Sequence, residues 1–143
     1  MKVMNKVNLI LGFTISVCTS VFGVYWYLFA GFLLFNIIDW LTGWYYAYLI
    51  GAESSKVGSK GIIKKIGYWI VIFISFYISK CFTVVGDMLE MDLSLTIGLG
   101  WFVLASYLVN EIRSILENGV KLDWNIPELL IKGLEITADK IKK

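Results

Sequence analysis

The apolar positions of this chain form long, nearly uninterrupted runs, and this pattern predicts helices that cross a membrane. The first run, residues 7–52, contains a single charged residue, Asp39. As one helix it would be about 69 Å long at 1.5 Å per residue, whereas the hydrocarbon core of a bilayer is about 30 Å thick. The run must therefore be interrupted, and Gly23, which follows Thr19 and Ser20, is the expected break.

Three ranges are predicted to be transmembrane helices: residues 24–50, 66–86 and 93–115. The first of them has aromatic residues at both ends, where they suit the two interfaces between membrane and water. The pattern predicts an all-α integral membrane protein, with residues 1–143 forming one membrane domain.

Residues 7–22 form a shorter predicted helix, for which two interpretations stay open. Its small and polar residues recur at spacings of three and four, which places them on one helical face. They are Asn8, Gly12, Ser16, Thr19 and Ser20, and Gly23 continues the spacing directly after the helix. The helix either lies on the membrane surface as an amphipathic helix or crosses the membrane as a fourth span, with Gly12, Ser16 and Ser20 as a packing stripe.

The C-terminal region is predicted to be an amphipathic helix over residues 125–141. Asn125 is the expected N-cap, Pro127 suits the first turn, and Glu128 completes the spacing of a capping box. We expect this helix to lie in the cytoplasm, on the membrane or on partner subunits.

Composition narrows the function classes. Hydrophobic residues make up 58% of the chain and charged residues 17%, against about 45–50% and about 25% in soluble domains, which argues against a soluble globular enzyme. Histidine is absent, and the sequence has no metal-ligand cluster, phosphate loop or nucleophile motif. We therefore expect no enzymatic activity, no cofactor and no metal, and the net charge of +2 gives no reason to expect a nucleic-acid partner.

The distribution of charge predicts the orientation of the chain. Residues 53–65 are predicted to form a basic loop, in which four lysines and one glutamate give a charge of +3. The lysines are Lys56, Lys60, Lys64 and Lys65. This loop should be cytoplasmic, and the acidic turn at residues 87–92 should lie outside. With four spans Lys2 and Lys6 would also be cytoplasmic, which favours four spans over three.

Two charged residues, Asp39 and Lys80, interrupt the apolar parts of the predicted spans, whereas Glu111 and Arg113 are expected where the last helix runs on into water. Asp39 and Lys80 lie about 16 Å and about 21 Å from the cytoplasmic helix ends, and a lone charge at the middle of the membrane costs roughly 2.5–3.5 kcal/mol. We expect them to pair, within one subunit or between neighbours, or Asp39 to face a pore. The alternatives are that Lys80 extends to the interface and that Asp39 is a structural cap near Thr42.

Two further features concern assembly and synthesis. Gly98 and Gly100 give the last span small positions for close helix contact, as a homo-oligomer would require. Met1 and Met4 form a possible dual start. Starting at Met4 removes the charge of Lys2, and such a charge opposes movement through an energised membrane by about 2.3 kcal/mol per 100 mV.

Four segments occur in an order and spacing that resemble the phage holin family of toxin-secretion and lysis holins. They are Asp39-Trp-Leu-Thr42-Gly43 with the following Ser54-Ser55-Lys56, then Gly58-Ser-Lys60-Gly61-Ile-Ile-Lys64-Lys65, then Asn110-Glu111-x-x-Ser114-Ile115-Leu116-Glu117-Asn118, and finally Ile126-Pro127-Glu128-Leu129. The resemblance covers about residues 36–134.

The resemblance implies a small phage protein that accumulates in the host cytoplasmic membrane, forms homo-oligomers and opens lesions in the lipid bilayer. A cell-wall hydrolase, or in some clostridia a large toxin, would then cross without having to bind the chain. Two other interpretations stay open: a small ion-coupled transporter that uses Asp39, and a membrane scaffold that forms no pore.

Overall fold

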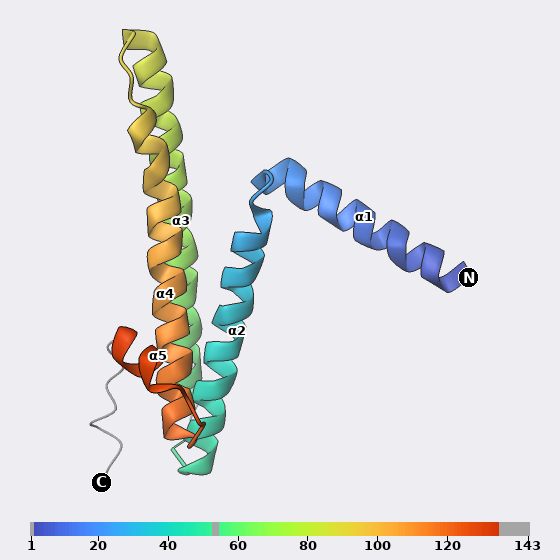
Figure 1. Ribbon diagram of the computed structural model, residues 1–143, viewed down its shortest axis with the longest axis vertical. Coiled ribbons are helices and arrows are strands. Elements are labelled where there is room, and N and C mark those ends of the chain that lie inside the picture. The colour runs from blue at the N-terminus through green and yellow to red at the C-terminus, as the bar shows by residue number, and fades with distance from the viewer. Residues whose placement is uncertain (1, 53–54, 135–143) are drawn as a thin grey trace.

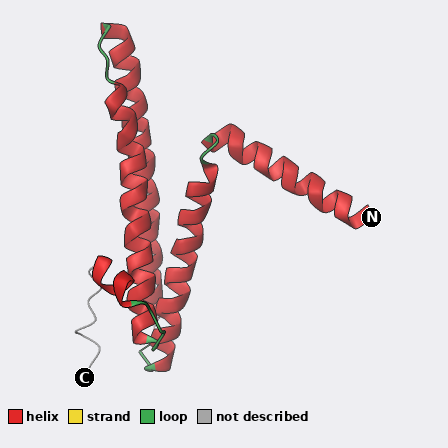
Figure 2. Ribbon diagram, in the orientation of Figure 1, coloured by secondary structure: helices red, strands yellow, loops and turns green. Residues whose placement is uncertain are grey.

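The computed structural model describes residues 2–52 and 55–134 of the chain (Figure 1). The elements are α1 (Lys2–Phe22), α2 (Trp26–Leu49), α3 (Ser55–Leu89), a short 3-10 helix η1 (Ser94–Ile97), α4 (Gly98–Lys121) and α5 (Glu128–Gly133). Figure 2 shows only helices and loops in the described residues. The predicted all-α class is confirmed.

Three helical stretches are long and apolar enough to cross a membrane: Trp26–Leu49, Gly58–Leu89 and Ser94–Lys121. They form a bundle in which α3 and α4 make a long hairpin and α2 packs chiefly on α4 (Figure 1). The three predicted transmembrane helices are therefore confirmed. The loop between η1 and α3 lies at one end of the bundle, and the ends of α2 and α4 lie at the other.

The basic loop predicted at residues 53–65 is wrong from Ser55 onward, because these residues form the first turns of α3. This helix has 35 residues, which corresponds to about 52 Å. Gly58 and Gly61 lie within this part of α3, but each glycine costs a helix only about 1 kcal/mol relative to alanine. The lysines of this segment favour helix, so the helical hydrogen bonds continue. Helix α4 likewise runs to Lys121, beyond the predicted end at residue 115.

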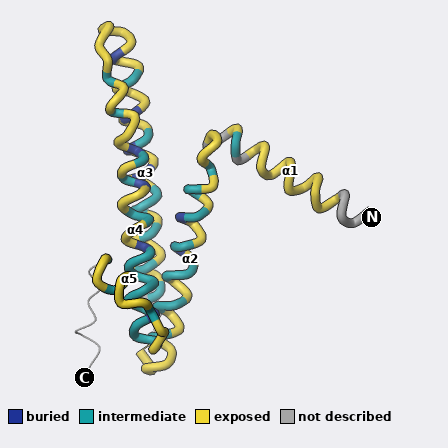
Figure 3. Tube along the Cα trace, in the orientation of Figure 1, coloured by how far each residue is buried: buried dark blue, intermediate teal, exposed yellow. Residues whose placement is uncertain are grey.

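Gly23 interrupts the first apolar run, as predicted. Helix α1 ends at Phe22, and Gly23 has a φ of +75°, the left-handed conformation that glycine adopts without steric cost. Helix α1 then projects away from the bundle (Figure 1), and its described side chains are almost all exposed (Figure 3). Its apolar part, Lys6–Val17, is shorter than a span. The surface helix and the fourth span both stay predictions.

The end of α4 is closed by a Schellman motif in which an acidic residue takes the place of the usual glycine. Asp123 has a φ of 57°, and the Trp124 N–H donates to the Gly119 carbonyl at 2.9 Å. A Cβ atom on Gly119 would lie 2.6 Å from the Trp124 ring. The missing side chain at Gly119 thus allows the chain to turn back against α4.

Helix α5 begins later than predicted. Pro127 occupies the cap position with an extended ψ of 134°, and no side chain caps the helix, so the prediction of Asn125 as N-cap is wrong. The reason is steric, since the ring of Pro127 disfavours helical backbone at Ile126. Residues 135–143 of the predicted helix lie outside the described residues.

The core of the bundle takes one residue from each span: Phe32, Ile72 and Leu104. The rings of Phe76 and Trp101 pack edge to face beside it, with centroids 4.9 Å apart. Most other large apolar side chains on the three spans are exposed (Figure 3). An apolar outer surface of this extent suits helices whose outer faces contact lipid.

Candidate functional site

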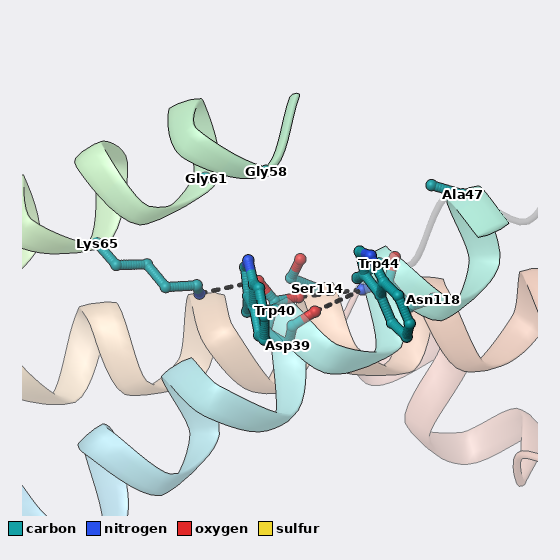
Figure 4. A pocket seen from close by; sticks show the side chains of 10 residues that line it. Asp39, Trp40, Trp44, Ala47, Gly58, Gly61, Lys65, Ser114 and Asn118 are labelled. Carbon is teal, nitrogen blue, oxygen red and sulfur yellow. Dashed lines mark hydrogen bonds and ion pairs between the residues drawn. The ribbon is translucent and has the colours of Figure 1, made fainter. Parts of the chain in front are cut away.

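Three charged side chains, one from each span, form a cluster near the end where α3 begins. Figure 4 shows two of them, Asp39 and Lys65. The Lys65 Nζ on α3 donates to the Asp39 Oδ2 on α2 at 2.8 Å, and it also pairs with the Glu111 Oε2 on α4. The Glu111 side chain is 2% exposed, whereas those of Asp39 and Lys65 are 16% and 13% exposed. We call Asp39, Lys65 and Glu111 the ionic cluster.

The ionic cluster contains two carboxylates and one ammonium group, so with all three groups ionised its net charge is −1. Burying charges is costly, and a charge that loses its partner inside a protein destabilises the fold by about 3–5 kcal/mol. Lys65 is the only member that contacts both others. Its ammonium group therefore keeps the two carboxylates, which repel each other, in one bundle.

Asn118 of α4 extends this polar site toward the end of α2. Its Nδ2 donates to the Asp39 Oδ1 and to the Thr42 Oγ1, both at 3.1 Å. The Thr42 hydroxyl in turn donates to the Ile38 carbonyl at 2.9 Å. Both oxygens of the Asp39 carboxylate are thus engaged, one by Lys65 and the other by Asn118. Gly43 lies beside the same amide, where a Cβ would make an ordinary contact at 3.5 Å.

Two hollows flank the ionic cluster. One of about 270 Å³ lies between α2 and α3 and is shown in Figure 4; Trp40 and Trp44 line it together with Gly43, Gly58 and Gly61. The other, of about 420 Å³, is more polar and includes Lys64, Arg113 and Glu117. Arg113 and Glu117 are themselves paired at 3.1 Å. Among the described residues, no group of His, Cys, Asp and Glu side chains could hold a metal ion.

The predicted pairing of Asp39 with Lys80 inside one subunit is wrong. Asp39 pairs with Lys65, and Lys80 is exposed farther along α3. Lys80 lies 15 residues beyond Lys65, or about 22 Å along the helix. The depth of Lys80 in the membrane was counted from residue 66, the predicted start of its helix. Helix α3 in fact begins eleven residues earlier, so the residue at the level of Asp39 is Lys65. Pairing of Lys80 with a neighbouring subunit stays a prediction, as does a pore-facing Asp39.

The lysines expected in a basic loop lie on α3 instead. Lys65 joins the ionic cluster, and the Lys64 Nζ lies 5.6 Å from the centre of the Tyr68 ring. Lys60 is exposed to solvent, and the side chain of Lys56 lies outside the described residues. The segment therefore contributes one lysine to the interior and keeps a basic surface at the end of the bundle.

The predicted small-residue positions differ in their surroundings. Gly100 packs against Phe76, where a Cβ would lie 2.7 Å from the ring, and its N–H donates to the Ser79 Oγ at 3.3 Å. Nothing lies within 4 Å of a Cβ at Gly98 or Gly12. On α1, Ser16 and Ser20 are exposed. Met1 lies outside the described residues, and the second start at Met4 stays a prediction.

Glu111 and Asn118 belong to one of the four segments that resemble the holin family, but neither was predicted to take part in a site. A signal was present, since Glu111 and Asn118 are seven residues apart and therefore share one face of a helix. Asp39 and Thr42 share a face of α2 in the same way. What could not be seen is that the two faces meet across the bundle.

The fold and the site define a multi-pass membrane protein with a buried ionic cluster between its spans. A family model described as the bacteriophage holin family matches residues 16–139. The chain belongs to this family.

Two uncharacterized proteins, from Listeria monocytogenes and Listeria innocua, are each 34% identical to this chain over 105 residues. The match covers 73% of this chain and 66% of each relative, so it spans slightly less than two thirds of their length. No solved structure matches. The comparisons thus agree with the predicted family.

Proposed function

We propose that this holin oligomerises in the bacterial cytoplasmic membrane and forms pores that release a cell-wall hydrolase. The observation that carries the proposal is a polar seam on the inner faces of the spans. Its members are buried or half-buried: Asn36, Asp39, Lys65, Ser75, Ser79, Glu111 and Asn118. A pore through lipid needs a polar lining, and the outer faces of the bundle are apolar.

In one copy the seam is closed by packing of the spans against one another. If several copies join and their bundles open toward a common centre, the same seam lines a water-filled lesion and the apolar faces stay in lipid. The family membership supports oligomerisation in a membrane. A lesion of this kind lets any protein through that is small enough, so the released protein need not bind the chain. A toxin would cross in the same way as a hydrolase.

The proposed orientation places the start of α3 and the ends of α2 and α4 in the cytoplasm. Lys60, Lys64 and Lys121 lie toward that end of the bundle, whereas Asp87 and Asp92 lie toward the other (Figure 1). Basic residues favour the cytoplasmic side of a membrane. The C-terminus of the chain is then cytoplasmic.

The two other function classes receive less support from the site. A cation transporter that uses Asp39 needs a free carboxylate, but both oxygens of Asp39 are engaged by Lys65 and Asn118. A scaffold that forms no pore does not require polar residues along the inside of its spans. Both classes are outcomes of the experiment that follows.

The test is induced expression in bacteria together with a cell-wall hydrolase that stays in the cytoplasm. We expect growth to stop abruptly after a delay, with release of the hydrolase, whereas the hydrolase alone should be retained. A change in ion or drug tolerance without release would identify a transporter. Hydrolase retained despite abundant chain in the membrane would contradict the proposal.

Two serine variants test whether the seam lines the pore. The hydroxyls of Ser75 and Ser106 each donate to the carbonyl four residues earlier, at 2.8 Å in both cases, but Ser75 is on the seam and Ser106 is exposed. Ser75→Ala should slow release severalfold at equal membrane levels, and Ser106→Ala should not. Equal release from the two variants would contradict the seam as the lining.

A further inference from the structure

A long groove runs between α2 and α3, on a side of the bundle where no other described helix covers it. Its lower part is the hollow of about 270 Å³ beside the ionic cluster, and its upper part is an apolar hollow of about 410 Å³. Trp40 and Lys65 line both parts, so the groove is continuous. It follows α2 over 15 residues, from Leu33 to Ala47, which corresponds to a rise of about 21 Å. The groove is therefore long enough to hold one helix packed along it.

The wall of the groove contains a polar group that one copy leaves unsatisfied. Asn36 lines the upper hollow and is 4% exposed. Its Nδ2 donates to the Phe32 carbonyl at 2.8 Å, whereas its Oδ1 is buried with no hydrogen-bond partner among the described residues. Buried polar groups are nearly always paired, and lipid offers no donor in place of water. This wall is therefore incomplete in a single copy.

Helix α1 brings basic residues to the groove, whose lower part includes the Asp39 carboxylate beside the Lys65 ammonium group. Helix α1 contains Lys2 and Lys6 and no acidic residue. It also has the small residues Gly12 and Ser16 on one face, which would let its backbone approach closely.

Residues of α1 and residues of the groove wall on α2 also lie at similar depths in the membrane. Helix α1 ends at Phe22 and α2 begins at Trp26, on the same side of the membrane. Gly12 and Asn36 are each ten residues from these ends, at a depth of about 15 Å. Lys6 and Asp39 lie about 24 Å and about 20 Å deep on the same measure, a difference that the lysine side chain spans. All copies share one membrane, so the agreement holds between neighbours.

We propose that α1 of one copy crosses the membrane and docks into the α2–α3 groove of a neighbouring copy. Helix α1 projects from its own bundle (Figure 1), which carries it toward a neighbour. A contact of this kind joins two different surfaces, so each added copy offers a new groove and the assembly grows beyond a dimer. The inference rests on the proposed function, because it names the contact by which the pore-forming oligomer is built.

The test is disulfide crosslinking in membranes between differently tagged copies in which Cys18 and Cys81 are replaced by serine. One copy has Gly12→Cys and the other has Ile37→Cys, which lines the groove. The matched control is Ile70→Cys, since Ile37 and Ile70 are 47% and 54% exposed and Ile70 lines neither part of the groove. We expect the mixed-tag crosslink at Ile37 to exceed that at Ile70 at least fivefold, and Lys6→Glu to reduce it.

Equal yields at Ile37 and Ile70, or no crosslink, would overturn the proposal. So would a disulfide confined to monomers when Gly12→Cys and Ile37→Cys are placed in one chain, because α1 would then fill the groove of its own copy. Release of the hydrolase by the cysteine-free chain is measured separately. Release without the mixed-tag crosslink refutes the docking alone, and the crosslink without release refutes the pore alone.

Discussion

Where α2 ends and α3 begins, three charged side chains from three helices meet, whereas at the opposite end α3 and α4 pack through small residues and rings. The charged end depends on Lys65, which holds two carboxylates. The hairpin end depends on Gly100, whose lack of a side chain admits Phe76. Charge pairing fixes which helices meet at a given level, since a buried charge that lacks its oppositely charged partner destabilises the fold. Close packing fixes how near two helices come.

The largest effect is expected from Lys65→Met, which nearly keeps the length of the side chain but leaves the buried Glu111 and the half-buried Asp39 without a cation. The variant should lose about 3–5 kcal/mol of the free energy of unfolding, measured by titration with a denaturing detergent. Lys80→Met is the control, because Lys80 is exposed and makes no ion pair within the described residues. Similar losses in the two variants would show that the ionic cluster does not hold the bundle.

A smaller effect is expected from Gly100→Ala at the hairpin end. The added Cβ would lie 2.7 Å from the Phe76 ring, and overpacking of this kind costs about 1–3 kcal/mol. Gly98→Ala adds the same group two residues away, with nothing within 4 Å, and should leave the free energy of unfolding nearly unchanged. Adding Phe76→Leu to Gly100→Ala should restore part of the loss. A loss at Gly98 equal to that at Gly100 would contradict the close contact.

The smallest effect is expected at the turn that caps the hairpin. Hydrogen bonds from Ser94 lower the pKa of Asp92, and the backbone N–H of Ser94 donates to the Asp92 Oδ1 at 3.0 Å. A carboxyl with a lowered pKa stabilises the fold above its ordinary pKa of about 3.9 and loses this effect as the pH falls through the folded value. Asp92→Asn should therefore lower the unfolding midpoint slightly at neutral pH, and the gap should close in acid. A gap that persists in acid would contradict the role of the charge.

The sequence was most informative where a single helix carries the signal. Runs of apolar residues are enough to place the three spans, because the bilayer sets their length, and Gly23 marks the break because few other residues adopt its backbone conformation. The start of α3 was missed because the lysines and glycines before Ile66 resemble a loop in composition. They stay helical because no residue there stops the hydrogen-bond ladder.

The sequence alone thus determined that this chain is an all-α membrane protein of the holin family, since hydrophobic length and motif spacing are properties of a linear chain. The tertiary structure decided which charges meet. Asp39 was predicted as an acid within a span, and its half-buried side chain belongs to the ionic cluster. Its partner depends on where α3 begins and on the register of two antiparallel helices. Because α3 starts eleven residues earlier than predicted, Lys65 and not Lys80 lies beside Asp39. Glu111 and Asn118 join them from a third helix. The depth of a side chain in the membrane is set by its own helix, whereas its partner is set by the packing between helices.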